Sequence, residues 1–291
     1  MFVPCRRALG LLGLVATVAL AQDPQPFVLQ TKHFEVIARD KAVADKKAKA
    51  LEECAGTFTK LFGVAPCRGC VKLLRAGQGS NAFANPGGGG GGGTGSGALP
   101  VSWTLDWFNP PPNEPKDPDD LMTHEAAHFM FTEWIGAKFK PKDPPRADRY
   151  ASKAPDWLDE AIAVWHEPEV MKAERRRQVR QAVDQRQHMP FETYFTSEHP
   201  LAAELASGRA DGAAFKAKED QLRIYYGQSL AILEFLNAIG GPKVMFGLIN
   251  DHADGSTTAE ILAKFKAPTI RTPQALEAMY LNWVKKNYKA R

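Results

Sequence analysis

Two histidines stand four residues apart in the stretch His124-Glu125-Ala126-Ala127-His128, whose surroundings are apolar at helical spacing. On an α-helix, residues i and i+4 lie on one face, so both imidazoles can point at one cation. Glu125 lies about 100° further round, where its carboxylate can act as a general base without binding the metal. A largely apolar helix carrying these side chains is costly to bury unless a metal satisfies them. The spacing predicts a buried helix over residues 120–135 and a metal site with ligands His124 and His128.

A catalytic zinc site needs a third protein ligand and keeps a fourth position open. Glu160 lies 32 positions after His128, in a second apolar stretch with helical spacing over residues 156–166. It could face the metal from a helix packed against the first. It could equally lie on a solvent face with Asp156, Asp159 and Glu167, in an acidic first turn that the helix dipole favours. Spacing alone leaves both alternatives open.

The two segments together resemble a known family. His124-Glu125-Ala-Ala-His128 followed by Trp157-Leu158-Asp-Glu160-Ala-Ile-Ala is similar to the gluzincin metallopeptidases, especially peptidase-MA-like exported bacterial proteins. The resemblance implies a thermolysin-like architecture in which Zn²⁺ is held by His124, His128 and Glu160, with Glu125 as the general base.

The chain departs from that family at two positions. Ala161 replaces a frequent glycine, and Val164 stands where thermolysin-like members carry the aspartate that partners the first histidine. Asp156 or Asp159 is the candidate substitute, and the sequence does not choose between them.

Peptide hydrolysis also needs a hydrogen-bond donor to the developing oxyanion. Tyr226 is the first candidate and Tyr225 the second; because they are consecutive on an expected helix, only one can face the site, and either could be a core tyrosine. His199 and His252 are weaker candidates, and His166 is expected to be a surface or structural residue and not a ligand. A substrate peptide would lie along an edge strand, for which residues 101–108, directly before the metal helix, are the candidate.

The remaining pattern predicts an α+β fold, with a small, mostly antiparallel N-terminal sheet and one helix, followed by a predominantly helical half. The N-terminal α+β lobe is expected over residues 22–118, with a glycine-rich loop at 77–100, and the helical lobe over 119–291. Strands are expected at 33–38, 71–74 and 101–108. Helices are expected at 41–62, 120–135, 156–166, 169–188, 221–239, 242–251, 257–265 and 272–289.

The N-terminus has the layout of a secretory signal peptide. Arg6 and Arg7 precede an apolar run over residues 8–20, and Ala19-Leu20-Ala21 is a small-x-small cleavage signature. We expect cleavage near Ala21 and export to the periplasm or the extracellular space; an uncleaved anchor helix is the alternative. No later segment is apolar enough to insert stably in a membrane.

Composition and cysteine content set further bounds. The net charge of +4, with no extended basic surface, gives no indication of a nucleic-acid partner. Because exported proteins can form disulfides, Cys54, Cys67 and Cys70 are expected to include a structural pair, either Cys54 with one of the others or Cys67 with Cys70.

Together these patterns predict an exported zinc metallohydrolase that acts on a peptide or protein. The alternatives are a non-catalytic binding module of the cell envelope, a zinc hydrolase of a non-peptide substrate, and a membrane-tethered structural protein with a chance motif. The intact Glu125 argues against a decayed, non-catalytic site.

Overall fold

In a computed structural model, the structure describes residues 26–75, 100–109, 119–135, 154–207, 212–264 and 271–289. The expected signal peptide over residues 1–21 lies outside this part of the chain. So does the expected glycine-rich loop over 77–100, except for its last residue.

The N-terminal half contains a four-stranded sheet. Strands β1 (Phe27–Gln30), β2 (Phe34–Ala38), β3 (Gly69–Arg75) and β4 (Trp103–Asn109) lie side by side in chain order. β1 pairs with β2 antiparallel, whereas β2 with β3 and β3 with β4 are parallel. The expectation of a mostly antiparallel sheet was therefore wrong. Alternation of apolar residues reports which face of a strand is buried and carries no information on its direction.

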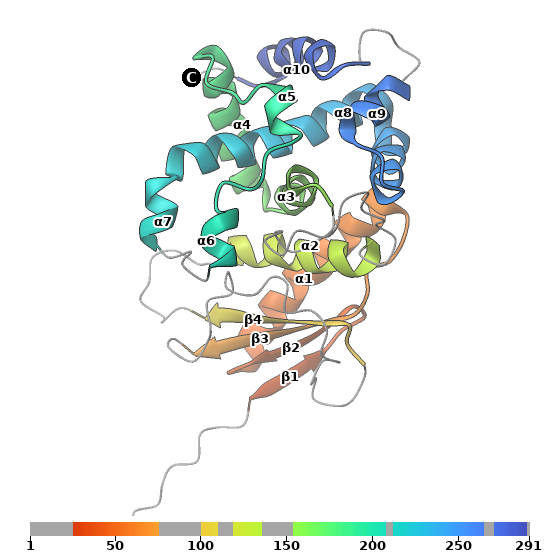
Figure 1. The fold of residues 1–291 in the computed structure, drawn as a ribbon. Helices are drawn as coiled ribbons and strands as arrows, with labels where there is room; N and C mark the ends of the chain where they lie inside the picture. The colour runs from red at the N-terminus through yellow and green to blue at the C-terminus, as the bar shows by residue number, and fades with distance from the viewer. Residues whose placement is uncertain are drawn as a thin grey trace, which may run out of the picture.

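Helix α1 (Lys41–Phe62) makes the crossover that a parallel β2–β3 pair requires. It begins where the Asp40 side chain accepts a hydrogen bond from the Val43 N–H, and it ends at Gly63 in the left-handed conformation (φ 69°). Its buried face packs on β1 and β2, and it also contacts α2 (Asp119–Ile135), which packs on β4. Figure 1 shows α1 and α2 together covering one face of the sheet.

The second half is helical, as expected. The helices that were expected there are α3 (Asp156–Trp165), α4 (Glu169–Asp184), α8 (Glu219–Ala253), α9 (Thr258–Lys264) and α10 (Pro273–Asn287). Three short helices, α5 (Phe191–Tyr194), α6 (Ala202–Ala206) and α7 (Gly212–Ala217), were not expected. α3 lies between α2 and α8, as Figure 1 shows, and every residue from Asp156 to Val164 is buried.

Helix α8 spans both of the helices that were expected on either side of Gly240-Gly241. Gly241 has non-helical torsion angles (φ 64°, ψ −165°), which only glycine adopts readily, and the chain bends there before helical structure continues. The two expected helices at 221–239 and 242–251 are therefore present as two arms of one bent element.

α4 and α8 approach closely at Gly227. A Cβ atom there would lie 3.0 Å from the carbonyl oxygen of Arg175 and 3.2 Å from Cβ of Val179. Because Gly227 has no side chain, the two helices can pack closely next to Arg175 on α4 and Tyr226 on α8.

The described cysteines are free thiols, so the expected disulfide is not formed. The Sγ atom of Cys54 lies 3.5 Å from the carbonyl oxygen of Thr123 on α2, whereas Sγ of Cys70 lies 3.6 Å from Oε1 of Glu35 on β2. These two buried thiols thus face different partners. Within the described ranges, no helix has both the length and the apolar character needed to cross a membrane.

Candidate metal centre

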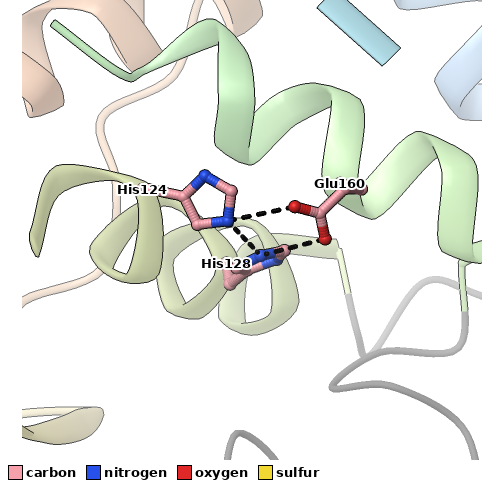
Figure 2. Close-up of side chains that lie close together, drawn as sticks. All are labelled: His124, His128 and Glu160. Carbon is pink, nitrogen blue, oxygen red and sulfur yellow. Dashed lines mark hydrogen bonds and ion pairs between the residues drawn. The ribbon is translucent and has the colours of Figure 1, made fainter. Parts of the chain in front are cut away.

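Two helices bring His124, His128 and Glu160 to one point, which Figure 2 shows in close-up. The Nε2 atoms of His124 and His128 are 3.2 Å apart. Oε1 of Glu160 lies 3.1 Å from Nε2 of His124, and Oε2 lies 3.6 Å from Nε2 of His128. The residues are 4%, 1% and 0% exposed. The Glu160 side chain thus faces the histidines of α2, and its alternative placement on a solvent face is excluded.

The outer nitrogen of each imidazole is held by a carboxylate. Nδ1 of His124 lies 3.1 Å from Oε1 of Glu167, and Nδ1 of His128 lies 2.8 Å from Oδ1 of Asp159. An ionised carboxylate only accepts hydrogen bonds, so each Nδ1 donates its proton. In a neutral ring the Nε2 atom then carries a lone pair, and both lone pairs point toward Glu160. This is the arrangement that metal-binding histidines usually adopt.

The residues fit a cation. Neither carboxylate oxygen of Glu160 accepts a hydrogen bond from a described residue, although the side chain is fully buried. A buried carboxylate without a donor is costly. One divalent ion would satisfy it and both imidazole lone pairs at once.

The pKa shifts of Glu160 and His124 also favour a positive charge at the centre. Burial raises the pKa of Glu160, but neighbouring His124 and His128 outweigh it and hold the pKa at about 2. Burial lowers the pKa of His124, yet Glu160 and Glu167 raise it well above its usual value. Both shifts mean that Glu160 is stabilised only when positive charge lies beside it. Protons on the imidazoles or a metal ion can supply that charge.

Glu167 forms a second ion pair. Nη2 and Nε of Arg175 lie 3.0 Å and 3.2 Å from its two oxygens, and Arg175 also stacks 4.7 Å above the ring of Tyr226. The sequence did not assign Glu167 this role. It follows Glu160 by seven positions but lies just beyond the end of α3, so helical spacing does not place it.

Neither Asp156 nor Asp159 takes the expected place beside the first histidine, so that prediction was wrong. Asp159 partners the second histidine, His128, and Glu167 partners the first. Asp156 accepts a hydrogen bond from the backbone N–H of His199 at 2.7 Å, so it holds a neighbouring segment.

Glu125 is buried beside the two histidines on α2, 4% exposed. Burial raises its pKa, while the imidazoles of His124 and His128 act in the opposite direction. Among the residues that the structure describes, four buried carboxylates and one arginine therefore lie at the centre: Glu125, Asp159, Glu160 and Glu167, with Arg175.

The tyrosine and histidine candidates fall into two groups. Tyr226 lies against the centre, with its ring centroid 6.1 Å from that of His124. Its hydroxyl lies 3.2 Å from Nε2 of His199, which in turn lies 3.8 Å from Oε2 of Glu160. Tyr225 points instead into an aromatic cluster with Tyr194 and is fully buried there.

Two histidines have structural partners outside the centre. His252 packs edge-on against Trp157 and lies 3.3 Å from the Thr258 hydroxyl. His166 lies with Nδ1 2.7 Å from the carbonyl oxygen of Ile162, one turn earlier in the chain. Of the two placements expected for His166, surface or structural, the structure shows the structural one. His252 is not among the residues brought to the centre.

No family model, curated protein or solved structure matches the chain.

Proposed function

We propose that the protein is a zinc-dependent metallohydrolase of the gluzincin type that cleaves peptide bonds. The observation that carries the proposal is Glu160. Its carboxylate is fully buried, has no hydrogen-bond donor among the described residues, and is faced by the Nε2 atoms of His124 and His128. Two imidazoles and one carboxylate suit zinc. Three protein ligands leave a fourth position for water or substrate, as catalytic zinc sites do, whereas structural sites use four.

A zinc ion held there would acidify a water molecule and polarise the scissile carbonyl group. Glu125 is the base that takes the proton from the attacking water and passes it to the leaving amine. Its place next to His124 on α2, buried among the other carboxylates, supports this role.

Tyr226 is the donor that stabilises the oxyanion of the tetrahedral intermediate. Its ring lies beside His124, and its hydroxyl is hydrogen-bonded within the same buried corner as Glu160. Such donors are effective because they are already oriented when charge develops.

The edge strand β4 is the surface on which the substrate backbone would add a strand. It lies at one side of the described sheet and packs directly on the metal helix α2. An extended peptide paired with β4 gains backbone hydrogen bonds independent of its sequence.

Metal content tests the proposal. Residues 22–291 are expressed as wild type, Glu160→Gln and Glu125→Gln, and bound zinc is measured after dialysis. We expect about one zinc per chain for wild type and Glu125→Gln, and much less for Glu160→Gln, which loses a ligand. A peptide library then reports cleavage, with Glu125→Gln as the inactive control.

Two results would contradict the proposed function. If the wild type holds no zinc, or if Glu160→Gln holds as much, the metal assignment is wrong and the non-catalytic binding module becomes the better interpretation. If zinc is bound as expected but no peptide is cleaved, the substrate class is wrong. Export is tested separately by N-terminal sequencing of the secreted product, which we expect to begin at Gln22.

A further inference from the structure

We infer that His199 fixes the direction of the Tyr226 hydroxyl proton and so makes Tyr226 a preset hydrogen-bond donor at the metal centre. His199 is thereby a positioning residue that acts through Tyr226. Its role in turnover rests on the proposed function; the orientation itself rests only on hydrogen bonds within the chain.

The protonation pattern of the imidazole follows from a backbone contact. The N–H of Leu201 donates to Nδ1 of His199 at 3.1 Å. An amide N–H can donate only to a nitrogen that carries a lone pair, so Nδ1 is unprotonated. A neutral imidazole with a free Nδ1 carries its proton on Nε2.

The Nε2–H group of His199 is within hydrogen-bond distance of the Tyr226 hydroxyl. The Tyr226 hydroxyl oxygen lies at 3.2 Å, whereas Oε2 of Glu160 is 3.8 Å away, beyond hydrogen-bond range. His199 therefore donates and the hydroxyl oxygen accepts. Because the hydroxyl has a single hydrogen, that hydrogen must point away from His199 and is available to another acceptor, such as an oxygen of a bound substrate.

The same nitrogen also excludes His199 from the metal. A ligating imidazole presents a lone pair to the ion, and Nε2 of His199 presents a hydrogen. The three-ligand count of the centre is thus preserved even though His199 lies close to Glu160.

Both ends of this hydrogen-bond chain are held in place. The backbone N–H of His199 donates to Oδ2 of Asp156 at 2.7 Å, which ties the segment to the start of the ligand helix α3. The ring of His199 stands edge-on to Tyr225, with an interplanar angle of 89°. On the other side, the Arg175 guanidinium lies 4.7 Å above the Tyr226 ring. The phenol ring and its hydroxyl are therefore positioned by separate contacts.

Hydrogen bonds in series strengthen one another. Donation from His199 withdraws electron density from the Tyr226 oxygen, and the remaining O–H becomes a better donor. The result is a hydroxyl whose proton direction is set before substrate arrives, so that little reorganisation is needed during the reaction.

The tautomer can be measured in the wild-type protein without any substitution. Long-range ¹H–¹⁵N correlation spectra of ¹⁵N-histidine-labelled protein distinguish a protonated Nε2 from a protonated Nδ1. We expect the Nε2–H form for His199, assigned by its absence in His199→Asn. A protonated Nδ1, or a doubly protonated ring, at neutral pH would overturn the inference.

Two substitutions then distinguish the loss of the hydrogen-bond donor at the Nε2 position from the loss of the histidine ring. In His199→Gln the side-chain amide nitrogen reaches the position of Nε2 and can still donate to Tyr226. In His199→Asn the shorter side chain reaches only the position of Nδ1. With ¹³Cζ-labelled tyrosine, we expect the Tyr226 signal to shift in His199→Asn and to remain near its wild-type position in His199→Gln. Equal shifts in both variants would contradict the donor role.

Kinetics give the third readout. We expect His199→Asn to lower kcat by about 10- to 100-fold with little change in KM and in zinc content, as misplacement of a catalytic group does. His199→Gln should restore most of the loss. In the Tyr226→Phe background, His199→Asn should have no further effect, and additive losses would show that His199 acts independently. If the chain cleaves no peptide, the proposed function fails, while the two spectroscopic results still decide this inference.

Discussion

Replacing Glu167 by glutamine should weaken both zinc binding and the fold, because this one carboxylate serves two partners. It accepts from Nδ1 of His124 and forms two hydrogen bonds with Arg175. The Glu167 side chain is fully buried and that of Arg175 is 13% exposed. The substitution keeps the shape of the side chain and removes its charge, so Arg175 is left buried without an anion.

The magnitudes follow from these contacts. Loss of a carboxylate that orients a metal-binding histidine costs about 10- to 100-fold in metal affinity, or roughly 1.4–2.7 kcal/mol. Breaking a buried ion pair by removing one partner costs about 3–5 kcal/mol of stability. Taking about 3 kcal/mol, the melting temperature of the metal-free protein should fall by about 6–12 °C.

Asp159→Asn is the matched comparison. Oδ1 of Asp159 accepts from His128, but its other oxygen has no hydrogen-bond partner among the described residues. We therefore expect a similar loss of zinc affinity and a smaller loss of metal-free stability. Glu174→Gln, on the partly exposed surface of the same helix as Arg175, controls for the loss of one negative charge.

The assays are a competition titration against a chromogenic zinc chelator and calorimetry of the metal-free proteins. A Glu167→Gln protein that melts within about 2 °C of wild type would show that the ion pair with Arg175 does not support the fold. A Glu167→Gln protein with wild-type zinc affinity would show that His124 does not depend on its carboxylate partner.

Three further outcomes are expected. Chelation should lower the melting temperature of the wild type, since zinc at 1,000 times its Kd stabilises by about 4.1 kcal/mol; Glu160→Gln should hardly respond, and an equal response would exclude Glu160 as a ligand. Gly227→Ala should cost about 1–3 kcal/mol because its Cβ would lie 3.0 Å from the Arg175 carbonyl oxygen, whereas Gly247→Ala, with open space, should be neutral or stabilising in urea unfolding. Burial lowers the pKa of His252 to about 4. This depressed pKa contributes stability that is fully present above about pH 6.5 and is lost as the pH falls toward 4, with a slope of up to about 1.4 kcal/mol per pH unit; His252→Gln should flatten that slope, and an unchanged slope would refute the assignment.

The long helices could be predicted from the sequence because their signals are local. The expected range of 41–62 is that of α1, whose ends are set by the Asp40 cap and by Gly63. The starts of α2 and α3 were predicted within one residue. In contrast, β1 has four residues, and α5, α6 and α7 have four to six. Such segments are too short for a periodic pattern, and tertiary contacts decide whether they form.

The inner part of the centre was also predictable, in two different ways. His124 and His128 follow from helical spacing alone. Glu160 needed the family resemblance, and the structure brings it to the two histidines. The outer partners were not predicted: Glu167 lies beyond the end of α3, and its pairing with His124 and Arg175 joins three separate segments. Spacing along one helix carries no information on which acid of a second helix reaches which histidine.

The segment from Asp156 to Glu167 supplies one candidate metal ligand, the acceptors for both histidines, and the anchor for the His199 segment. These contacts are spread over little more than the length of α3, so a sliding of α3 along α2 would disturb all of them together. A metal ion is therefore not expected to bind well while α3 is only loosely packed on α2. We expect metal uptake to be cooperative with docking of these two helices, so that zinc affinity itself reports whether the interface between α2 and α3 has assembled.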